Sequence, residues 1–219
     1  LFAGAGGMSL GFEQAGFDIA AAVEIDPVHA AVHEFNFPDT TIIPFSVECL
    51  SGALIRELAG IGDRRVDCVF GGAPCQGFSL IGQRVFDDPR NKLVAEFVRI
   101  VAELDASTFV FENVKGLTLG QHREFLDELV SAFNAAGYIV RLPWRVLNAA
   151  HYAVPQNRQR LFLIGAKKGQ NLPDYPQAKT NKAGTKNLIA DLPMGPTVRD
   201  ALSDLPDADR FKRLITTDV

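Results

Sequence analysis

The sequence has few cysteines and no long apolar run, and these two absences exclude several kinds of protein. The 219 residues include three cysteines, Cys49, Cys68 and Cys75. Their number is odd, and no two of them form a CxxC pair. A disulfide framework and a structural zinc site are therefore not expected, whereas a reducing compartment is. No apolar stretch approaches the roughly 20 residues that span a bilayer, and no charged-then-apolar secretion signal opens the chain.

The chain also lacks an excess of basic residues. It has 22 Lys and Arg against 26 Asp and Glu, a net charge of −4. Proteins that hold duplex DNA through many phosphate contacts usually carry a basic surface. If this chain acts on nucleic acid, the basic face must be local or lie on a part of the protein outside this sequence.

What the sequence does contain is a regular alternation of apolar strands and amphipathic helices. After an apolar strand end at 1–2, the predicted strands are 19–24, 41–45, 66–70, 108–112, 139–147 and 161–165. Helices are predicted between them over 8–16, 27–33, 49–59, 92–104 and 124–136. Asp26 is the predicted N-cap of the second helix, with Pro27 at its first position. This order predicts an α/β fold with a doubly wound, mainly parallel sheet. The last two strands have no helix between them, which allows one of them to run antiparallel.

The composition changes at about Lys167. Proline, asparagine, lysine and glycine dominate as far as Pro196, and only 197–205 has a helical pattern. We therefore predict one domain over 1–168 and an extension over 169–219 that leads towards a part not contained in this chain. No initiator Met precedes Leu1, so the N-terminus is interpreted as trimmed.

The turn Ala3–Gly7 follows the first predicted strand, where open α/β sheets bind ligands. Glu24 ends the next strand, 20 positions after Gly4, a spacing at which an acid can accept hydrogen bonds from ribose hydroxyls. The glycines do not match G-x-G-x-x-G, and no Gly-Lys-Ser/Thr follows. A ligand with an adenosine-like half and no phosphate fits, and S-adenosylmethionine is one. The alternative is a tight turn with a capping acid.

Cys75 lies in a loop between Pro74 and Gly77, whereas Cys68 lies in a Val/Phe strand where a thiol behaves as an inert hydrophobe. A loop cysteine can act as a nucleophile if a nearby cation or helix end lowers its pKa. The alternative is a cysteine without a chemical role.

Glu112 ends the strand at 108–112, and parallel strand ends face the same crevice, so Glu112 and Cys75 should face one site. A carboxyl group there can donate a proton or a hydrogen bond to a ring nitrogen. Arg158 and Arg160, two residues apart in an extended segment, should point the same way. A salt-bridged acid and a solvated basic edge are the alternatives.

These segments together resemble the ordered motifs of the DNA (cytosine-5) methyltransferases. The resemblance covers nearly the whole chain, and its motifs are Leu1-Phe2-Ala3-Gly4-Ala5-Gly6-Gly7, Val23-Glu24-Ile25-Asp26, Gly72-Ala73-Pro74-Cys75-Gln76-Gly77-Phe78-Ser79, Asp88-Pro89-Arg90-Asn91-Lys92-Leu93, Phe111-Glu112-Asn113-Val114, Pro155-Gln156-Asn157-Arg158-Gln159-Arg160 and Thr197-Val198-Arg199-Asp200-Ala201-Leu202.

The resemblance implies that 1–168 is a catalytic, cofactor-binding domain. Cys75 would attack carbon 6 of cytosine, Glu112 would hold the ring nitrogen, and Arg158 and Arg160 would position the base, with support from Asn113 and Gln76. The base would be flipped out of the duplex. The residues that would bind S-adenosylmethionine are Phe2, Ala3, Gly4, Gly7, Glu24, Ile25, Ser46, Val47, Pro74 and Leu93.

The sequence departs from the family at Ser46, where the family usually has an Asp that contacts the adenine amino group. The target-recognition domain and the last two motifs of the family would follow the end of this chain. A methyltransferase acting on transfer RNA and a non-catalytic fragment that binds S-adenosylmethionine are the alternatives. We expect double-stranded DNA as the partner, no metal, no membrane, a monomer, and the cytoplasm of a bacterium or archaeon.

Overall fold

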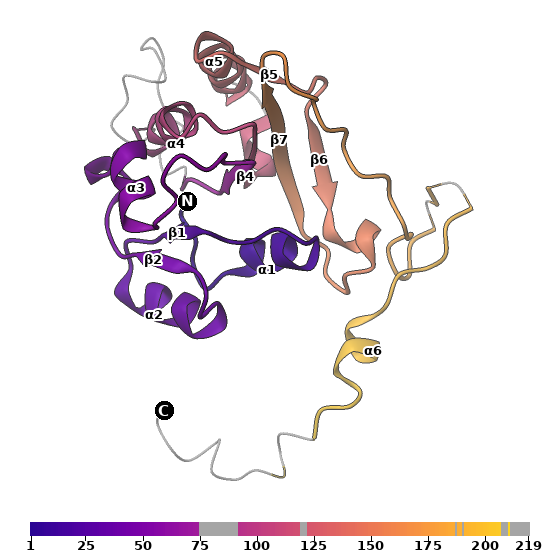
Figure 1. Ribbon diagram of the computed structural model, residues 1–219. Coiled ribbons are helices and arrows are strands. Elements are labelled where there is room, and N and C mark those ends of the chain that lie inside the picture. The colour runs from indigo at the N-terminus through magenta and orange to yellow at the C-terminus, as the bar shows by residue number, and fades with distance from the viewer. Residues whose placement is uncertain (75–91, 119–121, 187, 190, 207–209, 211–219) are drawn as a thin grey trace. The chain divides into compact units, whose positions relative to one another are not determined.

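The computed structural model of the chain describes residues 1–74, 92–118, 122–186, 188–189, 191–206 and 210 (Figure 1). Contacts divide the chain into two compact units. Unit 1 comprises Leu1–Val146 and Arg160–Tyr175, and unit 2 comprises Leu147–Gln159 and Pro176–Val219. The contacts therefore group the segment 147–159 with the tail, whereas the functional division predicted at residue 168 stays a prediction.

The strands form two sheets. Their bounds are β1 (Ala21–Val23), β2 (Thr41–Ile43), β3 (Cys68–Gly71), β4 (Thr108–Val114), β5 (Tyr138–Val140), β6 (Arg145–Asn148) and β7 (Gln159–Lys167). β1 and β2 pair in parallel, and the larger sheet has the order β3-β4-β7-β5 with β6 also paired to β7. β3 and β4 are parallel, whereas β7 is antiparallel to both β4 and β5. The mainly parallel sheet and its antiparallel strand are both confirmed.

Residues Leu1–Ala3 lie between β1 and β3, although they do not form the strand that the sequence predicts. The backbone N–H of Ala3 donates to the carbonyl of Val23 at 3.1 Å, and the backbone nitrogen of Leu1 donates to the carbonyl of Phe70 at 2.8 Å. Gly71 makes room for this approach, because a Cβ there would lie 2.2 Å from the Leu1 carbonyl oxygen. The first residues thus join the two sheets.

The helical segments follow the predicted order. They are α1 (Gly7–Gln14), α2 (Pro27–Asn36), η1 (Val47–Cys49), α3 (Gly52–Leu58), α4 (Lys92–Glu103), η4 (Lys115–Thr118), α5 (His122–Ala135), η5 (Ala149–Tyr152) and α6 (Val198–Leu202). Asp26 caps α2 as predicted: its side chain accepts from the backbone N–H groups of Val28 and His29, and Pro27 is the first helical residue.

Two predicted elements are divided in the structure. The strand predicted over 139–147 is two strands, β5 and β6, with Pro143 between them, because proline has no N–H to offer a strand ladder. The helix predicted over 49–59 begins at Gly52, where the Ser51 side chain accepts from the backbone N–H of Leu54.

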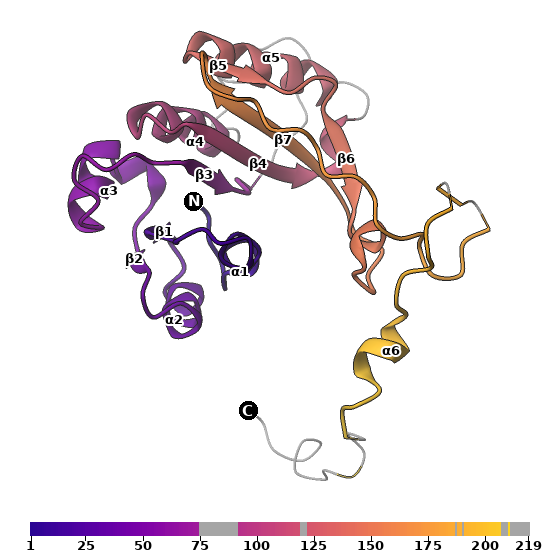
Figure 2. The same ribbon diagram turned by 45° about the vertical axis from the view of Figure 1, so that its right-hand side comes forward.

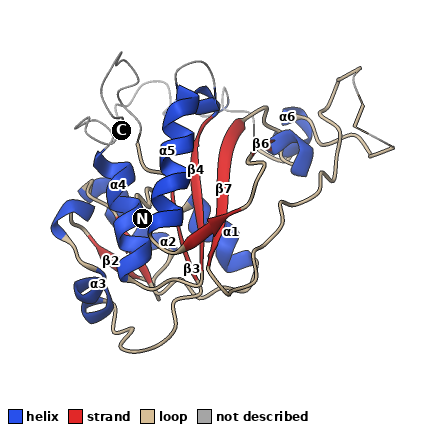
Figure 3. Cartoon of the chain, turned by 90° about the horizontal axis from the view of Figure 1, so that it is seen from above, coloured by secondary structure: helices blue, strands red, loops and turns tan. Residues whose placement is uncertain are grey.

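Within unit 1, helices cover both faces of the larger sheet. α4 and α5 run side by side over one face, and α1 lies on the other (Figures 2 and 3). Phe97 of α4 packs edge-on against Phe111, and Phe133 of α5 stacks on Phe109 with 3.8 Å between ring centroids. On the opposite face, Phe12 of α1 stacks on Phe70 of β3 at 3.9 Å. This is the doubly wound arrangement that the sequence predicts.

Candidate functional site

The turn Ala3–Gly7 adopts a backbone that requires glycine. Gly4 and Gly6 have φ angles of 53° and 99°, in the left-handed region that costs other residues free energy. Gly6 also lies directly on the ring of Phe37, because a Cβ there would be 2.1 Å from a ring carbon. At Gly4 and Gly7, in contrast, a Cβ would meet no atom within 4 Å. The turn is packed on one side and open on the other.

Glu24 fastens this turn to the end of β1. Its Oε2 accepts the backbone N–H of Gly4 at 2.8 Å, and its Oε1 accepts that of Asp26 at 2.9 Å. The residue is only 8% exposed, yet each carboxylate oxygen has acceptor capacity beyond the bond it makes. The side chain can therefore hold the turn and still accept hydrogen bonds from hydroxyl groups of a ligand.

Ile25 and Phe2 flank Glu24 and the turn. Ile25 is 67% exposed, which leaves an apolar face beside the carboxylate. Phe2 has a φ of 56°, a strained conformation for a bulky residue, and it packs half-buried against the core. Strain of this kind is often found at ligand sites.

The other predicted cofactor residues have varied surroundings. Ser46 caps η1, because its hydroxyl accepts from the backbone N–H of Glu48 at 3.3 Å. Val47 belongs to the core and is only 3% exposed, so it offers little surface to a ligand. Leu93 packs half-buried against the same core, and Pro74 is exposed.

At the ends of β4 and β7, Glu112 and Arg160 form an ion pair, with 2.8 Å between Nε of Arg160 and Oε1 of Glu112. Both side chains are about one quarter exposed (23% and 24%), so the pair is partly shielded from water. Gly72 allows the carboxylate its position, because a Cβ at Gly72 would lie 2.7 Å from Oε2 of Glu112.

Asn113 ties the end of β4 to the segment that leads into residue 75. It is 4% exposed, and its Nδ2 donates to the carbonyl of Ala73 at 3.0 Å. The supporting role of Asn113 stays a prediction. Cys75 and Gln76 themselves lie outside the described residues. Burial raises the pKa of the Cys68 thiol, so this thiol stays protonated near neutral pH and is a poor nucleophile, as predicted.

Arg158 belongs to unit 2, where its backbone carbonyl accepts the N–H of Ala149 at 3.0 Å and its side chain is exposed. Asn148 orders this segment: its Nδ2 donates to Oδ1 of Asn157 at 2.8 Å, and its Oδ1 accepts the backbone N–H of Ala150. Arg160, in contrast, belongs to unit 1 with Glu112.

The sequence did not indicate the supporting roles of three residues: Gly72, which leaves room for Glu112, and His33 and Asn36, which bond to the glycine turn. His33 and Asn36 are three residues apart on α2, which places them on one face of the helix. That spacing was the available signal, but the sequence does not indicate that this face meets the glycine turn.

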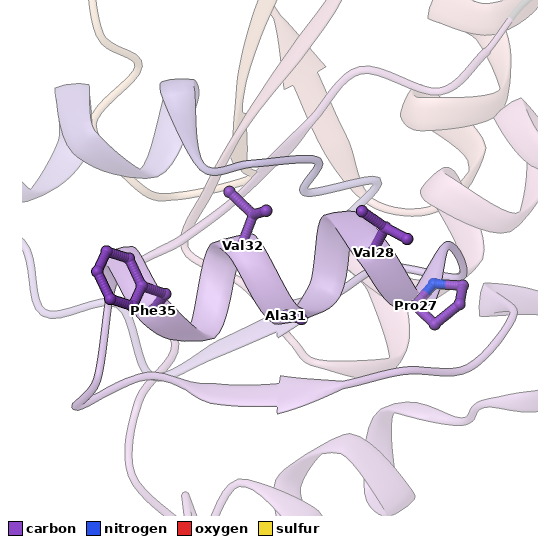
Figure 4. Close-up of a pocket in the computed structure, with 5 residues that line it drawn as sticks. All are labelled: Pro27, Val28, Ala31, Val32 and Phe35. Carbon is purple, nitrogen blue, oxygen red and sulfur yellow. The ribbon is translucent and has the colours of Figure 1, made fainter. Parts of the chain in front are cut away.

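The outer face of α2 carries a hollow of about 450 Å³ that is distinct from this site (Figure 4). Its lining consists only of apolar side chains: Pro27, Val28, Ala31, Val32 and Phe35. None of them can transfer a proton, attack a substrate or bind a metal, so the hollow is not a candidate active site.

In the described part of the chain, no three His, Cys, Asp or Glu residues are grouped so that they could hold a metal ion. In the same residues, no helix combines the length and the apolar character needed to cross a membrane.

Comparison with known proteins places these features in one family. A family model described as C-5 cytosine-specific DNA methylase matches residues 1–217. The Type II methyltransferase M.XorII of Xanthomonas oryzae pv. oryzae is 56% identical over 215 residues, which are 98% of this chain and 47% of the relative. M.AquIA of Picosynechococcus sp., also a Type II methyltransferase, is 38% identical over 95% of this chain and 88% of its own length. The chain thus spans about half the length of the first relative.

Solved structures agree with the fold. A protein encoded within a prophage of E. coli, provisionally assigned as a DNA modification methyltransferase, has a TM-score of 0.75 and 34% identity over 94% of this chain and 54% of its own. DNMT2 of Spodoptera frugiperda has a TM-score of 0.58 and 25% identity over 77% of this chain and 49% of its own.

The geometry of the turn predicts different outcomes for two matched substitutions. Gly4→Ala should lower the free energy of unfolding by about 1–2 kcal/mol, the usual cost of a left-handed residue, because its Cβ has open space. Gly6→Ala should cost about 3 kcal/mol or more, since the new methyl group also displaces the Phe37 ring. Urea unfolding measures both values, and equal losses would contradict the described packing.

Proposed function

Because the chain belongs to the C-5 cytosine-specific DNA methylase family, we propose that it transfers the methyl group of S-adenosylmethionine to carbon 5 of cytosine in DNA. One observation carries the proposal. The Glu24-fastened turn lies beside the carboxyl end of β1, and Glu112 lies near the carboxyl end of β4, where Arg160 at the start of the antiparallel β7 pairs with it; a cofactor and a base could meet at such strand ends.

The residues around the turn fit the cofactor. Glu24 has free acceptor capacity for ribose hydroxyls, and Ile25 offers an exposed apolar face for the adenine ring. The open side at Gly4 and Gly7 leaves room for a ligand beside the backbone. Bound S-adenosylmethionine supplies an electrophilic methyl group on a positively charged sulfur. Phe2, Ala3, Val47, Pro74 and Leu93 would complete the surroundings, and Ser46 would replace the usual acid.

We assign the nucleophile to Cys75 because it matches the family motif and because the pKa of the Cys68 thiol is raised by burial. The Cys75 thiolate would form a bond to carbon 6 of the base, and the ring electrons would then make carbon 5 nucleophilic. After methylation, loss of the carbon 5 proton and departure of the thiolate would restore the aromatic ring.

Glu112 would stabilise this addition by holding or protonating the ring nitrogen, with Arg160 fixing its carboxyl group at 2.8 Å. Oε1 of Glu112 pairs with Arg160, and Oε2, the oxygen beside Gly72, would be the atom that the carboxyl group offers to the base. Arg158 would contact the base or its phosphate, as its place in the family motif implies.

The proposed substrate is double-stranded DNA with the target cytosine flipped out, since the attack on carbon 6 cannot occur within the base stack. The Type II methyltransferases among the relatives favour DNA over transfer RNA. A monomer in the cytoplasm, without metal, remains our proposal for the complete protein.

The first test traps the covalent adduct. The complete protein, mixed with DNA containing 5-fluorocytosine and with S-adenosylmethionine, should form a species that survives denaturing electrophoresis, because fluorine at carbon 5 cannot leave as a proton does. Cys75→Ser should abolish the shifted band. Cys49→Ser is the matched control, since Cys49 is exposed and free, and should keep it. A band that persists in Cys75→Ser would refute the assignment.

The second test moves Glu112 without replacing it. Gly72→Ala should push Oε2 of Glu112 out of position and lower kcat by about 100-fold, the usual effect of misplacing a catalytic group by about 1 Å. Affinity for S-adenosylmethionine should stay within about twofold of wild type. Gly116→Ala, where the nearest atom is 4.0 Å from the new Cβ, serves as the control and should be active. An unchanged kcat in Gly72→Ala would count against the role of Glu112.

A further inference from the structure

We propose that His33 and Asn36 of α2 are positioning residues for the cofactor, which hold the glycine turn in its binding conformation without touching the ligand. This inference rests on the proposed function, because it concerns the affinity of the same turn for S-adenosylmethionine. Neither residue belongs to the motifs that carry the family resemblance, and both act through the backbone of the turn.

His33 makes a hydrogen bond to the turn at Gly4. The ring is fully buried, and its Nδ1 lies 3.0 Å from the carbonyl oxygen of Gly4. A carbonyl oxygen can only accept, so Nδ1 must carry the hydrogen. Nε2 is buried with no partner among the described residues, so the bond from Nδ1 is the one hydrogen bond that they give this ring.

Asn36 makes a hydrogen bond to the next peptide group. Its Nδ2 donates to the carbonyl oxygen of Ala5 at 3.0 Å, one helical turn after His33. Phe37 supports Gly6 from the same end of the helix, with its ring tilted against His33 at 4.8 Å between centroids. Three consecutive residues of the turn are therefore held by side chains at the end of α2.

These contacts matter because Glu24 holds the turn at the N–H of Gly4, whereas the carbonyls of Gly4 and Ala5 are held from α2. Gly4 and Gly6 have wide conformational freedom, and their left-handed backbone is one of several accessible states. A peptide group is planar, so a Gly4 carbonyl that points to α2 fixes the N–H of Ala5 in the opposite direction. With both carbonyls held, the turn is ordered before the ligand arrives, and the ordering cost does not reduce the affinity.

The test compares affinities for S-adenosylmethionine in the complete protein by calorimetry. His33→Leu and Asn36→Asp each remove one donor and should raise Kd by about 3- to 10-fold, the equivalent of one hydrogen bond. His33→Asn should restore an affinity close to wild type, because its Nδ2 takes the place of Nδ1. At saturating cofactor, kcat and the affinity for DNA should be unchanged in all of them.

Glu34→Gln, an exposed position on the same helix, is the matched control and should bind as wild type does. If His33→Leu does not fold, the exposed Asn36→Asp variant still decides the question. Wild-type affinity in both donor-removing variants would overturn the positioning role while the proposed function stands. A wild-type protein that does not bind S-adenosylmethionine would refute the proposed function itself, and this inference with it.

Discussion

The carboxylate of Glu24 makes two hydrogen bonds on which the geometry of the site depends. One joins it to the backbone of Gly4 and the other to that of Asp26, so the first turn, the end of β1 and the start of α2 are fixed to one buried group. A carboxylate taken out of water loses hydration and needs such donors in exchange. The same bonds leave further acceptor capacity on both oxygens. A structural need and a binding capacity are thus met by one side chain.

The parallel strands β3 and β4 connect this arrangement to the residues proposed for catalysis. Leu1–Ala3 joins the two sheets. At the end of β3, Gly71 leaves room for the backbone of Leu1, and Gly72 leaves room for the carboxylate of Glu112. Asn113 then links β4 to Ala73, just before the segment that contains Cys75. Small residues at the strand ends therefore set the positions of the charged ones. The packing of these residues thus supports the Glu112–Arg160 pair, which is itself partly exposed.

Much of this could be predicted from the sequence because it depends on local patterns. The cap at Asp26 and the alternation that gives a doubly wound sheet follow from residue type and spacing, and the structure confirms them. The division of the predicted strand 139–147 was missed because the apolar pattern continues across Pro143. The pairing of Glu112 with Arg160 depends on the antiparallel register of β7 beside β4, which spacing alone does not give. The contact between His33 and Gly4 joins residues 29 positions apart, so only the packed structure reveals it.

The central claim is that the Glu24-fastened turn is the binding site of the cofactor. A crystal structure of the complete protein with S-adenosylhomocysteine tests it most directly. We expect the ribose hydroxyls within about 2.6–3.2 Å of the Glu24 carboxylate oxygens, with the bond from Gly4 still in place. A ligand bound elsewhere, or a Glu24 side chain that must release Gly4 to reach the ribose, would contradict the account.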